Sequence, residues 1–424
     1  MNQDPSTSLQ HASDLDSQDE LASFRQRFAI LDSELIYLDG NSLGRLPKDT
    51  IPRLEHLVEE QWGRRLIRGW NEGWYDLPER VGAKMAGLLG ARPDEVIMAD
   101  ATSVNLFKLA LSSLALRPGR TKIVTDNLNF PSDLYILDGV CRLAGPEYEV
   151  QLVESADDIH GPIDALSQAI DRQTALVSLS HTAFKSGYTY DMAALTEIAH
   201  RAGALVLWDC SHSAGALPIE LNQTGADLAI GCSYKYVNGG PGGPAFLYIR
   251  HDLQDQMTNP ISGWMGQKDP FNFELNYEST PGLRRFLSGT PPILSLAAVE
   301  VGIDLLLEAG LKQIRSKSVR QSEYLIKLWE HLLAPLGYRL KSPREATHRG
   351  SHVTLGHDQG YRIDRVLIDQ LNVLPDFRPP DNIRMGIAPL YNSFTDIHHA
   401  VARLQLVVED RLYEQYSLED LLVT

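Results

Sequence analysis

The chain has 424 residues, of which 43% are hydrophobic and 22% charged, a globular composition that excludes a largely disordered or fibrous protein. Its 39 Lys and Arg residues against 55 Asp and Glu residues give a formal net charge of −16, which disfavours nucleic acid or an anionic membrane as a partner. Three cysteines without a CxxC pair, no apolar leader and no long apolar stretch predict a cytoplasmic protein without disulfides, a structural metal site or a membrane span.

Residues 1–19 are rich in Ser, Gln and Asp and show no apolar periodicity, so we expect a flexible tail there. From residue 95 onward, short apolar runs alternate with helix-like segments. The runs that predict buried strands are Glu95–Met98, Lys122–Thr125, Ala175–Leu179, Ala204–Trp208 and Ala245–Ile249. The helix-like segments include Val104–Leu116 and Asp191–Ala202. This alternation predicts an α/β fold with a mostly parallel sheet covered by helices on both faces.

After Pro292 the pattern changes to long helices, which we expect at 293–309 and 311–333. Strand candidates follow at 338–340, 352–355 and 382–385, and a closing helix begins at Phe394. The sequence therefore predicts a large α/β domain over residues 20–309 and a smaller α+β domain over residues 310–424. We expect the N-terminal part of the first span to contribute to the small domain and to the substrate site.

An aspartate and a lysine mark the most informative part of the sequence. Asp209 ends an apolar run shortly before His212, at the carboxyl end of a predicted parallel strand, where α/β sheets bind ligands. Lys235 follows Tyr234 and precedes a glycine-rich loop over residues 239–243. A desolvated lysine has a lowered pKa, so its neutral amine can form a Schiff base with an aldehyde. The pair suits pyridoxal phosphate, which needs a lysine for its aldehyde and a carboxylate at its pyridine nitrogen.

Two further segments suit the same cofactor. Thr102 and Ser103 open a predicted helix directly after a strand, a geometry that binds anions such as phosphate. Phe130 follows the strand candidate at 122–125 and is expected at the same edge of the sheet, where its ring could cover a planar ligand. The glycines of residues 239–243 lack the GxGxxG spacing, so the sequence gives little support to a dinucleotide site.

Each of these residues also has an ordinary structural explanation. An Asp after a strand is more often a helix cap, and a Lys beside a Tyr is more often a surface residue. Thr102 and Ser103 are equally well explained as a helix cap, and Phe130 as part of the core. Only the combination of all of them favours a cofactor site.

Taken together, these residues resemble the kynureninases, members of the fold type I pyridoxal-phosphate enzymes. The resemblance extends from about Tyr37 to Phe394 and rests on several separate motifs. They are Tyr37–Gly44, Phe130–Asp133, Asp209 with His212, Ser233–Tyr236, Gly263–Trp264, Thr290–Pro292, and Arg384 ahead of Ala388–Phe394.

The resemblance implies pyridoxal 5′-phosphate as the cofactor, with Lys235 forming the Schiff base, Asp209 at the pyridine nitrogen and Phe130 covering the ring. The phosphate is then expected at Thr102 and Ser103. The remaining residues that the resemblance places at the cofactor are Pro131, Ser132, Asp133, Ser180, His212, Tyr234, Trp264 and Thr290, with Trp264 and Thr290 acting across the interface of a homodimer. Arg384 is expected to bind the substrate α-carboxylate, and Asn41, Ser42 and Trp70 to lie at the substrate. Tyr234 is also the candidate for proton transfer during catalysis.

The family cleaves L-kynurenine with water into anthranilate and L-alanine, a step that links tryptophan breakdown to anthranilate or NAD synthesis. In its animal members, a histidine stands at the position of Trp70 and an asparagine at that of Thr290, and those enzymes favour 3-hydroxykynurenine. The bulky indole and the short threonine predict a preference for kynurenine here. The alternative is that Trp70 only packs a loop.

Two other functions remain open at this point. A cysteine desulfurase or another class V aminotransferase relative would share the fold and Lys235. A desulfurase, however, needs a reactive cysteine on a mobile loop, whereas Cys141, Cys210 and Cys232 lie in or beside predicted helices and strands. A non-catalytic cofactor-binding protein is the second alternative, against which the presence of the lysine, aspartate and arginine argues.

Overall fold

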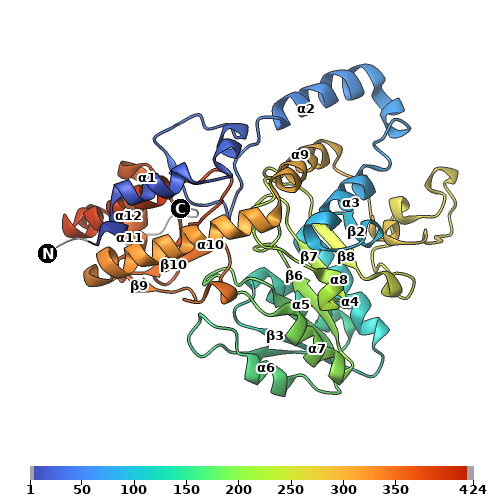
Figure 1. Cartoon of the computed structure of the whole chain (residues 1–424). Coiled ribbons are helices and arrows are strands. Elements are labelled where there is room, and N and C mark those ends of the chain that lie inside the picture. Colours follow the sequence, from blue (N-terminus) through green and yellow to red (C-terminus); the bar gives the residue numbers. More distant parts are fainter. Residues whose placement is uncertain (1–3, 418–424) are drawn as a thin grey trace.

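The structure is a computed structural model that describes residues 4–417, and a seven-stranded sheet forms the centre of its larger lobe (Figure 1). The strands are β2 (Val96–Met98), β3 (Lys122–Asp126), β4 (Glu149–Val153), β5 (Thr174–Ser180), β6 (Leu205–Asp209), β7 (Leu228–Gly231) and β8 (Phe246–Ile249). Their order in the sheet is β2-β8-β7-β6-β5-β3-β4. Only β8 runs antiparallel to its neighbours, so the predicted mostly parallel α/β sheet is confirmed.

Helices cover both faces of this sheet. They are α3 (Leu77–Leu89), α4 (Thr102–Leu116), α5 (Pro131–Ala144), α6 (Ile163–Ala169), α7 (Met192–Ala202), α8 (Leu221–Thr224) and α9 (Ile293–Ala309). Helix α2 (Thr50–His56) packs against α9 and projects away from the sheet, as Figure 1 shows. In β6, Val206 and Trp208 pack into one apolar core, and Leu205 and Leu207 pack into another on the opposite face. This burial on both faces explains why the central strands are continuous apolar runs without alternation.

The smaller lobe contains an antiparallel sheet in the order β12-β13-β10-β9. Its strands are β9 (Arg339–Leu340), β10 (His352–Gly356), β12 (Asp376–Arg378) and β13 (Asn382–Gly386). Three helices, α10 (Leu311–Leu328), α11 (Gly360–Leu371) and α12 (Phe394–Glu409), accompany it, and a π-helical turn (Trp329–Leu333) continues α10. Figure 1 shows α10 running between the two lobes, in agreement with Ile314 packing into the larger core and Leu325 into the smaller one.

The N-terminal segment joins the smaller lobe. The short strand β1 (Ile36–Tyr37) pairs in parallel with β11 (Val373–Leu374), and Leu38 is fully buried in the smaller core. From there the chain continues past Asn41 and Ser42 toward the larger lobe, so residues far apart in sequence meet where the lobes join.

The expectation of a flexible tail over residues 1–19 is wrong for its described part. Helix α1 (Leu9–Ser17) lies beside α12, as Figure 1 shows, and the carboxylate of Asp16 accepts hydrogen bonds from the backbone N–H groups of Phe394 and Thr395 at 2.7 and 3.0 Å. Asp16 thereby satisfies donors at the start of α12 that no helical carbonyl reaches. This helix depends on tertiary contacts, so the local sequence pattern does not reveal it. Among residues 4–417, no helix is long and apolar enough to cross a membrane.

Candidate active site

A cavity of about 230 Å³ opens where the two lobes meet, and we call it the Lys235 cavity. Its walls come from the larger lobe, the N-terminal segment and the smaller sheet. The residues that line it are Asn41, Ser42, Thr102, Ser103, Phe130, Ser132, Asp133, Asp209, Ser211, His212, Tyr234, Lys235, Arg378 and Arg384. All of them except Ser211 and Arg378 are residues that the sequence singles out.

Two carboxylates, Asp209 and Asp133, lie together in this cavity. Asp209 is the last residue of β6, and its Oδ1 accepts a hydrogen bond of 2.8 Å from the backbone N–H of Ser211. Asp133 lies in the first turn of α5. Burial and the neighbouring Asp209 raise the pKa of Asp133 well above its ordinary value, which disfavours the charged form of Asp133. Asp209 is then the carboxylate available to a protonated pyridine nitrogen.

The amine of Lys235 faces an imidazole. Its Nζ lies 2.9 Å from Nε2 of His212. Burial and the neighbouring Lys235 lower the pKa of His212 well below its ordinary value, so the imidazole is neutral and Nε2 accepts a hydrogen bond from the lysine. The same Nζ lies 6.0 Å from the centre of the Phe130 ring, which packs edge-on against Phe184. The predicted lysine, imidazole and aromatic ring therefore share one space.

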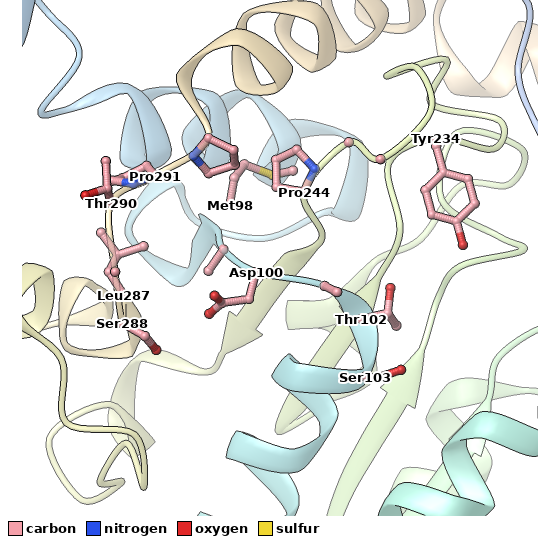
Figure 2. A pocket seen from close by; sticks show the side chains of 16 residues that line it. Met98, Asp100, Thr102, Ser103, Tyr234, Pro244, Leu287, Ser288, Thr290 and Pro291 are labelled. Atoms are coloured by element: carbon pink, nitrogen blue, oxygen red, sulfur yellow. The ribbon is translucent and has the colours of Figure 1, made fainter.

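The start of α4 forms the other end of the cavity. Thr102 and Ser103 are its first two residues, and no side chain caps the free backbone N–H groups of this 15-residue helix. The hydroxyl of Ser103 lies 3.1 Å from that of Ser132, at the start of α5. A second cavity of about 450 Å³ continues from Thr102 and Ser103, and Figure 2 shows Tyr234 on one side of it and Thr290 across from it. An anion at this helix start would satisfy several donors at once.

Tyr234 borders both cavities. The neighbouring Cys232 and burial raise the pKa of Tyr234 above its ordinary value, so the phenol keeps its proton at neutral pH. Its hydroxyl can therefore act as a proton donor in the cavity.

Arg384 approaches from β13. Its guanidinium is 2% exposed and forms an ion pair with Asp376, its direct partner across the β12–β13 pair. Nη2 also donates to the hydroxyl of Ser42 at 2.9 Å, and the amide oxygen of Asn41, turned toward the guanidinium, accepts from Nε at 2.8 Å. The structure thus brings Arg384, Asn41 and Ser42 together, as expected for one subsite.

Five of the predicted site residues do not line the Lys235 cavity of the chain: Trp70, Pro131, Ser180, Trp264 and Thr290. Ser180 is paired with Asp209 across β5 and β6, and Pro131 is the first residue of α5. Thr290 lines the second cavity and also a third, apolar cavity of about 430 Å³ that Trp70 shares. Trp264 is 40% exposed and packs edge-on against Phe271.

Arg378 is the main residue that the sequence analysis misses. It lies on β12, a strand of three residues that is too short to give a recognisable pattern. A signal was present, because Asp376 and Arg378 are two residues apart just ahead of Arg384. In an extended segment, side chains at this spacing lie on the same side. Only the pairing of β12 with β13 reveals that these side chains share a face.

The residues present fit pyridoxal phosphate. The cofactor has an aldehyde, a basic ring nitrogen, a flat ring and a phosphate, and the cavity offers an amine, a carboxylate pair, an aromatic face and an uncapped helix start. The buried Nδ1 of His212 has no hydrogen-bond partner among the described residues, as expected for a site with room for a polar ligand.

Comparisons with known proteins agree with this geometry. Residues 36–369 match the pattern of the aminotransferase class-V family. A kynureninase of Pseudomonas fluorescens is 44% identical over 410 residues, which cover 96% of each chain. The chain belongs to the kynureninase family. A second member of this family, from Burkholderia mallei (strain SAVP1), is 40% identical over 400 residues, or 93% of this chain and 94% of that one. The resemblance of the sequence motifs to the kynureninases is therefore confirmed.

Solved structures of other enzymes share the kynureninase fold of this chain. The apo cysteine desulfurase from Thermococcus onnurineus NA1 superposes with a TM-score of 0.80 at 20% identity, covering 92% of this chain and 98% of that one. A lysine-to-alanine mutant of C-DES, with glycine covalently linked to its PLP cofactor, gives a TM-score of 0.77 at 19% identity, covering 90% of this chain and 98% of that one. At this identity the similarity is one of fold alone.

The cysteines of the chain do not suit desulfurase chemistry. Cys141, Cys210 and Cys232 are all buried, and burial raises the pKa of each thiol above its ordinary value, that of Cys141 to about 11. A nucleophilic cysteine needs the opposite, an accessible site and a lowered pKa.

Proposed function

We propose that this chain hydrolyses L-kynurenine to anthranilate and L-alanine, with pyridoxal 5′-phosphate bound at Lys235. Family membership supports the reaction and the cofactor, since the curated relatives at 40% and 44% identity are kynureninases. The observation that carries the residue roles is the convergence of Lys235, Asp209 and Arg384 on one cavity.

The chain's residues would hold the cofactor at four points. Lys235 would bind its aldehyde, Asp209 its ring nitrogen and the start of α4 its phosphate, and Phe130 would cover the ring, with Ser132 and Tyr234 nearby. When bound, the cofactor supplies a protonated ring that draws electrons from the substrate carbon atoms. Burial disfavours the charged form of Asp133, and this keeps a second negative charge away from Asp209.

The proton transfers fall to Lys235, His212 and Tyr234. With the substrate bound, the amine of Lys235 would act as the general base that removes the substrate α-proton. His212 Nε2, 2.9 Å from Nζ, orients that amine by accepting a hydrogen bond from it. Tyr234 holds a proton on its hydroxyl and delivers it while water attacks the γ-carbonyl and the Cβ–Cγ bond breaks.

The substrate is oriented by its carboxylate at Arg384, with Ser42 and Asn41 fixing the guanidinium. We propose that the enzyme works in the cytoplasm as a homodimer, in which Trp264 and Thr290 complete the neighbouring subunit's site. The position of Trp264 outside the Lys235 cavity of its own chain supports this arrangement.

The test is to incubate the purified protein with the cofactor and L-kynurenine and to follow anthranilate fluorescence together with alanine formation. We expect both products in equal amounts, and none from a Lys235→Ala variant. Borohydride reduction followed by peptide mapping should place the cofactor adduct on Lys235. Absence of anthranilate would overturn the proposed reaction, and an adduct on another lysine would overturn the assignment of Lys235.

A further inference from the structure

The guanidinium of Arg384 is already occupied by acceptors of the protein itself. Nη1 donates to the backbone carbonyl of Phe184 at 2.6 Å, and Nη2 donates to Ser42 and pairs with Asp376. Nε faces the amide oxygen of Asn41 at 2.8 Å. A guanidinium has five N–H groups, so little of Arg384 is left for a substrate carboxylate.

A second guanidinium, that of Arg378, lies on the same face of the smaller sheet. Asp376 is paired with Arg384 across β12 and β13, and Arg378 follows two residues later, so its side chain leaves the strand on the same side. Arg378 lines the Lys235 cavity, and its Nη1 pairs with Asp376 at 2.6 Å and donates to the carbonyl of Phe377. Its Nε and Nη2 have no acceptor within the part of the chain that the structure describes, and 34% of the side chain is exposed.

The charges around this pair of arginines do not balance. Asp376 bonds to both guanidiniums. Burial and the neighbouring Asp376 raise the pKa of Asp39 to about 7 and that of Asp364 well above its ordinary value. Burial therefore disfavours the charged form of Asp364, and Asp39 is only partly ionised at neutral pH. The cluster keeps an excess of positive charge, which a single carboxylate from outside would neutralise.

We propose that Arg378 binds the substrate α-carboxylate side by side with Arg384, and that Asp376 holds the two guanidiniums in place. Nε and Nη2 form one edge of the guanidinium, the edge that takes both oxygens of a carboxylate in a fork. That edge of Arg378 has no acceptor among residues 4–417, whereas the corresponding edge of Arg384 faces Asn41. The identity of the substrate rests on the proposed function, but the carboxylate subsite follows from the arginine pair itself.

The test compares ligands that differ only in the carboxylate. In Arg378→Gln, we expect the KM for L-kynurenine to rise by roughly 10- to 100-fold, the scale of a lost charge-assisted hydrogen bond. The Ki of the amine that has hydrogen in place of the kynurenine carboxyl group should change by less than about twofold, because that amine never contacts the guanidinium. The matched control is Arg339→Gln on β9, which removes an exposed arginine that pairs with Asp358 and Asp381 and should leave both constants unchanged. An equal loss for both ligands, or no change in KM, would overturn the proposal.

An indirect effect through Asp376 is separated by a double-mutant cycle. If Arg378 only positioned Arg384 through that carboxylate, Asp376→Asn alone would raise KM, and Arg378→Gln would add nothing in that background. Direct binding predicts a further rise in KM when the two changes are combined.

If the wild type released no anthranilate, the proposed function would fail. The same variants would then be titrated with L-alanine and ethylamine, whose only difference is again the carboxylate, and a loss confined to alanine in Arg378→Gln would still support the subsite.

Discussion

At the scale of single residues, the structure gives the two neighbouring carboxylates of the site different tasks. Burial beside Asp209 raises the pKa of Asp133 and disfavours its charged form, whereas Asp209 accepts a hydrogen bond from a backbone N–H at the end of β6. The sequence shows only two aspartates that each follow a strand. Their proximity, and with it the division of labour, comes from the fold.

We therefore expect Asp209→Asn to lower kcat/KM by at least about 100-fold, the scale on which a removed charge-stabilising group costs an enzyme activity. The neutral amide cannot hold the ring nitrogen of the cofactor protonated. The matched control is Asp133→Asn, where an amide replaces a carboxyl group whose raised pKa disfavours its charged form, and we expect a loss of less than about tenfold. Steady-state kinetics and the cofactor absorbance of both variants provide the measurement. Equal losses in the two variants would show that the carboxylates share the task.

The choice between kynurenine and 3-hydroxykynurenine is also a matter of single residues. Trp70 and Thr290 line the same apolar cavity, next to the indoles of Trp62 and Trp74. A ring hydroxyl placed against such a wall lacks a partner, and an unpaired buried polar group costs about 1 to 3 kcal/mol. We expect kcat/KM to favour kynurenine by roughly 5- to 150-fold. The double variant Trp70→His with Thr290→Asn should reduce that ratio. A wild-type enzyme that prefers the hydroxylated substrate would contradict the assignment.

At the scale of elements, the N-terminal segment after β1 packs directly against the loop that carries Lys235. The backbone N–H of Gly44 donates to the carbonyl of Tyr234 at 2.8 Å, and a Cβ atom on Gly44 would lie 2.3 Å from the carbonyl oxygen of Lys235. No side chain fits such a gap, because backbone atoms on both sides fix it.

Gly44→Ala should therefore displace the lysine loop and weaken cofactor binding by roughly tenfold, or about 1.4 kcal/mol. The dissociation constant of the cofactor, measured by absorbance after dialysis, checks this expectation. Gly139→Ala on α5 is the control, because its Cβ would meet nothing closer than 3.7 Å. Cofactor affinity unchanged by Gly44→Ala would show that the loop position does not matter for binding.

The turn between β3 and α5 contains a buried carboxyl group that makes its stability depend on pH. Asp126 accepts hydrogen bonds from the backbone N–H groups of Leu128 and Asn129 and from the hydroxyl of Tyr190. Burial raises the pKa of Asp126 from 3.8 to about 6. Because the folded state holds this proton more tightly than the unfolded chain, the group destabilises the fold as pH rises from about 4 to 6.

Asp126→Asn removes this pH dependence. The free energy of unfolding of the variant minus that of the wild type should therefore rise by up to about 3 kcal/mol between pH 4 and pH 7. The amide can keep the backbone contacts and reverse its bond to Tyr190. Urea unfolding of both proteins at the two pH values measures the difference. A difference that stays constant, or that falls with rising pH, would contradict the assigned shift.

At the scale of the whole molecule, the proposed homodimer predicts sites built from two chains. We expect co-expression of Lys235→Ala and Trp264→Ala chains to restore about a quarter of the wild-type sites, since random pairing gives mixed dimers with one intact site each. Specific activity per bound cofactor measures the recovery. The control pair is Lys235→Ala with Asp209→Asn, which lie in the same cavity of the same chain and should restore nothing. No recovery in the first pair would mean that Trp264 serves its own chain.

The sequence alone determined the class of fold and most of the residues in the site. Buried parallel strands appear as continuous apolar runs, so five of the seven strands of the larger sheet were predicted from the pattern. The cofactor motifs are also local, because Phe130–Asp133 and Ser233–Tyr236 each lie within four consecutive residues. Two strands were missed: the partly exposed β4 has polar residues between its apolar ones, whereas β7 is a buried apolar run that the sequence analysis overlooked.

Only the tertiary structure decided what depends on segments far apart in the chain. Helix α1 is held by its contacts with α12, the short β12 exists because β13 pairs with it, and the Lys235 cavity requires the N-terminal segment and the smaller sheet to meet the larger lobe. The raised pKa of Asp133 and the free edge of Arg378 likewise follow from burial and from partners that lie far away in sequence. The physical reason is that hydrophobic periodicity is a local signal, whereas desolvation, ion pairing and strand register arise from neighbours that only the folded chain brings together.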